Sequence, residues 1–171
     1  MSVRTAILAF AVSLTVSFTA IFANAAEALT TFNVILLQPD PVLQARVPDI
    51  DALAAYIQAL QAQARVSVPG PGAANSGFIV VALRPGGRSN AWLDFDDPLN
   101  EGVSEALVKR LRAVTVPPVQ GGAVVFALKV GIWGGKESSR VAPAPAEWRD
   151  AAAKAGHALE PGELALSIWK D

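Results

Sequence analysis

Two apolar runs of β-forming residues constrain this chain more than any other feature. Residues 77–83 (Gly-Phe-Ile-Val-Val-Ala-Leu) are apolar at every position, which is typical of a central strand covered on both faces. The longer run, residues 123–133, alternates apolar residues on one face with Lys129 and Gly131 on the other, and this pattern predicts partial exposure. Both runs require a β-sheet that other elements cover.

Turn and helix signals place further elements around these two strands. Pro-Gly-Gly-Arg at residues 85–88 predicts a β-hairpin that returns through residues 90–95. Apolar residues at helical spacing predict one helix that opens at Pro48-Asp49 and another that opens at Asp97-Pro98, with Asp97 as its N-cap. A short additional β run occupies residues 31–37.

The order of these elements predicts an α+β fold, an antiparallel β-meander of three or more strands with two helices packed on one face. We expect one domain over residues 26–135, and 171 residues are enough for a single domain with a sizeable core. Residues 136–171 form a tail that we expect to pack on the domain. The tail contains a weak helix at 147–155 and a short strand at 164–169.

The first 25 residues have the three parts of a secretory signal peptide. Arg4 precedes an apolar run over residues 5–22, and Ala-Asn-Ala at 23–25 places small residues where a signal peptidase cleaves. The alternative is an uncleaved membrane anchor, although the run is short for a span and contains Ser and Thr. Cleavage after Ala25 would leave no stable membrane span, and we predict a periplasmic protein.

The composition excludes several classes of site. There is no cysteine, which excludes thiolate catalysis and Cys-ligated metals. His157 is the only histidine, so no multi-histidine site can form, and a net charge of −1 argues against nucleic acid as a partner. We interpret the acidic cluster Asp94, Asp96, Asp97 and Glu101 as a strand end and a capping turn, and the four tryptophans as core. We therefore predict no catalytic, cofactor-binding or metal-binding residues and no cofactor.

The stretch from about residue 50 to residue 133 resembles the C-terminal domain shared by TonB and TolA, periplasmic parts of bacterial envelope energy-transducing systems. The residues that carry the resemblance are 77–81 (Gly-Phe-Ile-Val-Val), the turn at 85–88, and the joint Leu107…Leu111…Val116-Pro117-Pro118…Val124-Val125-Phe126. The resemblance covers roughly half of the mature chain. Residues 26–49 are too short for the long spacer of those families, which argues against an energy-coupling role.

In the TonB-like pattern the final strand receives an extended peptide from a partner, so the resemblance implies a binding edge at residues 123–133. We predict that Val125, Ala127 and Lys129 form this edge, since an unpaired strand must be covered, defended or used. The predicted function is an exported, non-catalytic periplasmic module that binds a peptide or an envelope protein by strand addition. The alternatives are a structural envelope-maintenance domain whose termini cover the edge, or a hydrolase that uses Asp94, Asp96 and Glu101.

Overall fold

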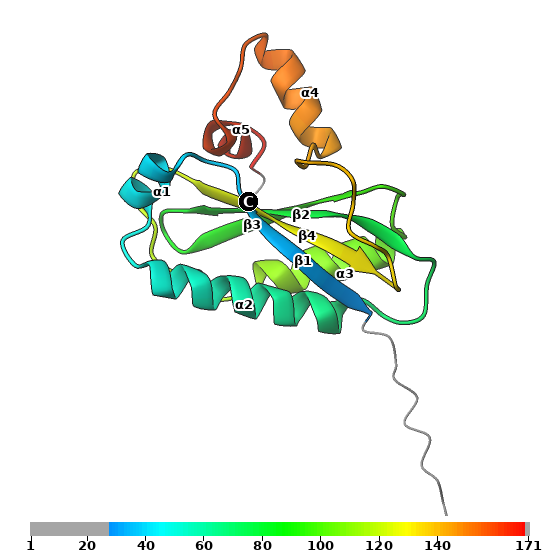
Figure 1. The fold of residues 1–171 in the computed structure, drawn as a ribbon. Coiled ribbons are helices and arrows are strands. Elements are labelled where there is room, and N and C mark those ends of the chain that lie inside the picture. Colours follow the sequence, from blue (N-terminus) through cyan, green and yellow to red (C-terminus); the bar gives the residue numbers. More distant parts are fainter. Residues whose placement is uncertain (1–27, 170–171) are drawn as a thin grey trace, which may run out of the picture.

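A computed structural model describes residues 28–169 of the chain, and the predicted signal peptide (residues 1–25) lies outside the described residues. The sheet has four strands, and five helices surround it (Figure 1). In chain order the elements are β1 (Leu29–Leu36), α1 (Asp40–Arg46), α2 (Ile50–Ser67), β2 (Asn75–Arg84), β3 (Arg88–Phe95), α3 (Glu101–Arg112), β4 (Val124–Ile132), α4 (Ala146–Ala155) and α5 (Pro161–Ser167). None of the described helices has both the length and the apolar character that a membrane span requires.

All neighbouring strands pair antiparallel, which confirms the α+β class. The spatial order is β1-β4-β2-β3, so the sheet is not a simple meander, because β4 follows β3 in sequence yet pairs with β2. The β2–β3 hairpin is present as predicted. Gly86 and Gly87 have φ angles of 91° and 70°, a backbone conformation that glycine adopts without strain.

The prediction that residues 123–133 form a free edge is wrong. β4 is an inner strand, paired with β2 on one side and with β1 on the other. The three residues predicted to receive a peptide already face β1: the N–H of Leu37 donates to the carbonyl of Val125 at 3.2 Å, and Ala127 and Lys129 pair with Ile35 and Asn33. The additional N-terminal strand has taken the position that a partner would need.

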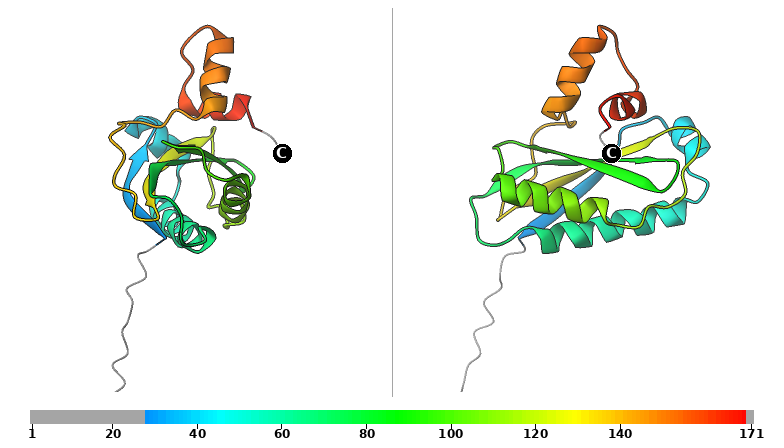
Figure 2. Two further views of the ribbon diagram at one scale, coloured as in Figure 1. Left: turned by 90° about the vertical axis from the view of Figure 1, so that its right-hand side faces the viewer. Right: turned by 180° about the vertical axis from the view of Figure 1, so that it is seen from behind.

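Helices cover both faces of the sheet, in two separate cores (Figure 2). α2 and α3 pack on one face, as predicted for two helices, and the Tyr56 ring of α2 meets Phe126 of β4 edge-on at 6.5 Å. On the other face lie α4 and α5, which bury Trp148 and Ala165 against the sheet. The tail therefore packs on the domain and adds a third layer. This explains why residues 77–83 are apolar on both faces of the strand.

Both secondary-structure elements of the described part of the tail are helices. α4 confirms the weak helix expected at residues 147–155, but the predicted strand at 164–169 is wrong, because residues 161–167 form α5. Glu160 and Glu163 make a reciprocal capping box at its start, with Pro161 in the first turn. These local signals favour a helix over a strand. The short helix α1 was not expected from the sequence.

The start of α3 gives a direct test of a capping prediction. Asp97 was expected to be the N-cap residue, but the N-cap is Asn100, three residues later, whose side chain accepts a hydrogen bond from the N–H of Gly102 at 3.0 Å. We expect Asn100→Ala to lower the free energy of unfolding by about 1 kcal/mol. Asp97→Ala should leave it unchanged, because Asn75 binds only the Asp97 backbone. Urea denaturation of both variants measures the difference, and a larger loss in Asp97→Ala would contradict the assignment.

Candidate functional site: a groove beside strand β3

β3 forms one end of the sheet, and its outer edge has no strand beside it among residues 28–169. The N–H of Asp96 donates to the carbonyl of Ser76 at 2.8 Å, so even-numbered positions of β3 direct their backbone groups toward β2. Because backbone direction alternates along a strand, Ala91, Leu93 and Phe95 direct theirs outward. The Ala91 N–H is already bound locally by the Oδ1 atom of Asn90, at 2.9 Å.

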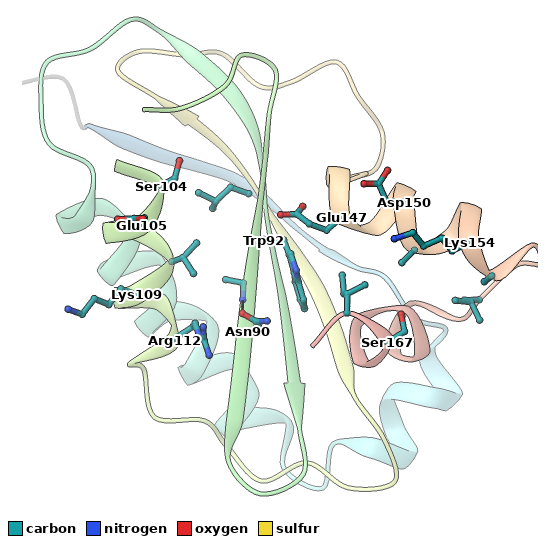
Figure 3. A pocket seen from close by; sticks show the side chains of 17 residues that line it. Asn90, Trp92, Ser104, Glu105, Lys109, Arg112, Glu147, Asp150, Lys154 and Ser167 are labelled. Atoms are coloured by element: carbon teal, nitrogen blue, oxygen red, sulfur yellow. Dashed lines mark hydrogen bonds between the residues drawn. The ribbon is translucent and has the colours of Figure 1, made fainter. Parts of the chain in front are cut away.

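A groove of about 1290 Å³ follows this outer edge (Figure 3). Residues 90–93 of β3 form its floor, α3 forms one wall, and α4 forms the other, with α5 at one end. The hairpin and the short link from β3 to α3 position the floor and the first wall, and the C-terminal tail supplies the second. The side chains that contribute charge or hydrogen-bonding groups to the lining are Asn90, Ser104, Glu105, Lys109, Arg112, Glu147, Asp150, Lys154 and Ser167.

Trp92 fixes the floor of the groove to the tail. Its side chain is buried and points to the α4–α5 face of the sheet, where it meets Trp148 edge-on at 5.4 Å and Trp169 at 6.4 Å. The guanidinium of Arg84 lies 4.6 Å from the Trp169 ring. These contacts confirm the core interpretation of Trp92 and Trp148 and hold the second wall against the end of the sheet.

Both walls carry exposed charges at helical spacing. Glu105, Lys109 and Arg112 follow one another along α3, and α4 presents its own charged stripe, with acids nearer its N-terminus and Lys154 in its last turn. Residues one or two turns apart lie on the same side of a helix. Within the described part of the chain, no ion pair engages these groove charges, which leaves them available to a bound molecule.

Two residues of the acidic cluster, Asp94 and Asp96, anchor the tail. Arg140 binds the carboxylate of Asp94 at 2.7 Å and that of Asp96 at 2.9 Å, and it also donates to the Asp94 carbonyl at 2.6 Å. The N–H of Ala144 donates to the same Asp94 carboxylate at 2.7 Å. The two aspartates, at alternate positions of β3 and its end, thus share Arg140 as a partner. The described residues contain no group of three or more histidines or acids placed to hold a metal ion.

A second anchor joins the start of α5 to the sheet. The Gln38 side chain accepts from the N–H of Val125 at 2.9 Å and donates to the Ala123 carbonyl at 3.0 Å and to Glu160. Arg46 donates to the same Ala123 carbonyl at 2.7 Å and lies 3.4 Å from Glu160. The buried amide of Gln38 therefore satisfies backbone groups of β4 and connects them to the tail.

Glu160 makes this second anchor sensitive to pH. Burial raises its pKa, but the hydrogen bond from Gln38 and the charge of Arg46 outweigh burial and hold the pKa below its ordinary value of 4.5. The unfolded chain therefore takes up this proton at higher pH than the folded chain, so the stabilisation is complete above pH 4.5 and is lost as the pH falls through the lower folded pKa. We expect the free energy of unfolding to fall less steeply in Glu160→Gln than in the native chain between about pH 5 and about pH 3, roughly one unit on either side of the ordinary carboxyl pKa of about 4. Urea unfolding at each pH measures this. Identical slopes would contradict this.

His157 lies exposed just after the αL cap Gly156 of α4, and its Nδ1 atom is 2.9 Å from the Ala155 carbonyl. It has no part in the groove. The outer edge of β3 was not predicted, because the sequence does not reveal which strand ends the sheet.

Comparisons with protein-family models, with curated proteins and with solved structures found no match to this chain.

Proposed function

We propose that this protein is an exported, non-catalytic interaction module of the bacterial envelope that binds an extended peptide segment by adding it to the outer edge of β3. The observation that carries the proposal is the open strand edge on the floor of a groove between two helices. Strand addition uses main-chain hydrogen bonds for affinity and side-chain contacts for specificity. The outward backbone groups of Leu93 and Phe95 can form the main-chain hydrogen bonds, and the groove walls provide the side-chain contacts.

The other end of the sheet is less suited to this role. The register of β1 against β4 shifts between Thr31 and Asn33, and such a bulge disrupts the ladder and twists an edge away from potential partners. The exposed Phe32 side chain lies at this irregularity. β3, by contrast, pairs with β2 in one uninterrupted register from residue 77 opposite 95 to residue 84 opposite 88, which favours β3 as the site of strand addition.

The dimensions also fit an extended peptide. β3 has 8 residues, and paired strands have the same rise of about 3.3 Å per residue, so an added segment of about eight residues spans the edge. A volume of about 1290 Å³ exceeds the range of typical small-molecule pockets, roughly 300–1,000 Å³. This argues for a segment of chain as the occupant.

Photo-crosslinking in cells tests the proposal. We would place a photoreactive phenylalanine at Val108 of α3 or Ala151 of α4, which line the groove, and at Gln58 of α2 as an exposed control outside it. Mass spectrometry then identifies the products. We expect a discrete product from the two groove positions and none from Gln58.

A proline variant links any product to the strand edge. The N–H of Leu93 points away from β2, so Leu93→Pro removes no hydrogen bond of the sheet and is tolerated at an edge, and circular dichroism checks that it folds. The crosslinks should disappear in this variant. Products that persist in this variant would show that the partner does not pair with the β3 edge. The absence of products from a folded native chain would favour the alternative of a structural envelope domain whose sheet binds no partner.

Export is tested on the N-terminus. If the proposed signal peptide is cleaved after Ala25, the mature chain begins at Ala26, and the intact mass of protein purified from the periplasmic fraction shows this directly. Recovery of the full-length chain from membranes would support the uncleaved anchor.

A further inference from the structure

The groove has a charge polarity that specifies the kind of peptide it accepts. Building on the proposed strand addition, we propose that β3 binds a peptide in which a basic residue, an apolar residue and an acidic residue follow one another from N- to C-terminus. The basic and acidic side chains contact α3, and the apolar side chain contacts Trp92.

The polarity arises from the direction of α3. The helix follows β3 after five residues (96–100) and runs back along it, so charges in its first half lie toward the C-terminal end of β3. Figure 3 shows Glu105 level with Trp92, closer to that end than Arg112, which lies level with Asn90, and Lys109 lies between the two. One end of the wall is thus acidic and the other basic, and neither charge is engaged by an ion pair among residues 28–169.

Strand geometry then assigns the side chains of a bound peptide. In an antiparallel pair, residues directly opposite each other point to the same face of the sheet. Ala91 and Leu93 belong to the core on the α2–α3 face, and Trp92 to the core on the α4–α5 face. A peptide residue opposite Ala91 or Leu93 therefore points toward α3, and the residue between them points toward Trp92 and Ile168.

The peptide direction completes the order. Every strand pair in this sheet is antiparallel, and antiparallel pairing is slightly more stable per residue. We therefore place the peptide antiparallel to β3, with its N-terminal end beside the C-terminal end of the strand. Its residue opposite Leu93 comes first and lies near Glu105, which favours Lys or Arg. Its residue opposite Ala91 comes two positions later and lies near Lys109 and Arg112, which favours Asp or Glu.

Two synthetic peptides of identical composition test the order. One is acetyl-Thr-Thr-Lys-Val-Glu-Thr-Thr-amide, and the other exchanges Lys and Glu. Because net charge and hydrophobicity are the same, only the order of charges differs. We expect the Lys-first peptide to bind about five- to tenfold more tightly, since two matched pairs replace two like-charge contacts. Binding is followed by NMR on the backbone amides of Leu93 and Phe95.

A charge-reversed groove gives the decisive comparison. The triple variant Glu105→Lys, Lys109→Glu, Arg112→Glu changes only exposed positions of α3 and should prefer the Glu-first peptide. Arg110→Glu, an exposed change on the same helix outside the groove lining, should keep the native preference. N-methylation of the Lys and Glu amides, which face β3, should abolish binding, while N-methylation of the Val amide should not.

The outcomes separate this inference from the proposed function. An order preference that inverts in the triple variant establishes the charge polarity. Equal binding of both peptides at the β3 edge overturns the polarity and leaves strand addition standing. No shift of the Leu93 and Phe95 amides with either peptide at millimolar concentration overturns both.

Discussion

Replacing Trp92 with alanine is expected to lower the free energy of unfolding by about 3–5 kcal/mol, the range for large aromatic side chains removed from a core. Trp92 is 8% exposed and contacts both tail tryptophans, Trp148 and Trp169. Its loss removes the apolar platform on which α4 and α5 pack, and the sheet cannot collapse to fill the space. Urea denaturation measures the change, and limited proteolysis should cleave first between α4 and α5.

Trp92→Phe is the matched control. It keeps an aromatic ring on the floor of the groove and should cost less than the alanine variant, because it leaves a smaller cavity. If Trp92→Ala lost less than 1 kcal/mol (well under the range for a buried aromatic), the tail would contribute little to the fold and the second wall of the groove would not be held.

The parts of the fold that depend on neighbouring residues were predictable from the sequence. α2 follows from apolar spacing and from Asp49, whose side chain accepts from the Ala52 N–H as an N-cap. The hairpin follows from two glycines at positive φ. The beginning of α5 had an equally local signal in Glu160 and Glu163, but the apolar run that follows it was interpreted first as a strand.

The position of β4 in the sheet depends on contacts distant in sequence, and here the prediction failed. Lys129 and Gly131 were interpreted as signs of partial exposure of one face of the strand. A Cβ atom on Gly131 would lie 2.1 Å from the Gly135 carbonyl, so glycine is required by the close approach of the chain that follows β4. Lys129 lies over the Phe78 ring and pairs with Glu137 at 3.0 Å. Both residues serve the packing of the segment after β4, which the spacing of side chains along one strand does not reveal.

The candidate site was unpredictable for the same reason. β3 forms the edge only because β4 inserts beside β2 instead of continuing after β3. The second wall comes from the tail, whose helix α4 begins only at Ala146. What the sequence did contain was the pair of aspartates at alternate positions, Asp94 and Asp96. Side chains two positions apart point to the same face of a strand, but their partner, Arg140, lies more than 40 residues away.

We expect Asp94→Ala to release the tail at its first anchor and to lower the free energy of unfolding by about 2–3 kcal/mol. The Asp94 carboxylate is only 9% exposed and holds both Arg140 and the N–H of Ala144. Removing one partner of such a pair leaves the others without compensation. Because Arg140 remains one-third exposed, water recovers part of the loss, which places the effect below that of a fully buried ion pair.

Asp97→Ala is the matched control. It also removes one carboxylate, but from a residue that does not contact Arg140, so both the free energy of unfolding and the protease resistance should stay unchanged. In Asp94→Ala, cleavage should appear between residues 141 and 145, while the α2–α3 face of the sheet keeps its core. If the tail detaches in this way, α4 no longer forms the second wall, and peptide binding should weaken together with tail docking. Unchanged protease resistance in Asp94→Ala would mean that Gln38, Arg46 and Glu160 suffice to hold the tail, and that the wall of the groove depends on the second anchor alone.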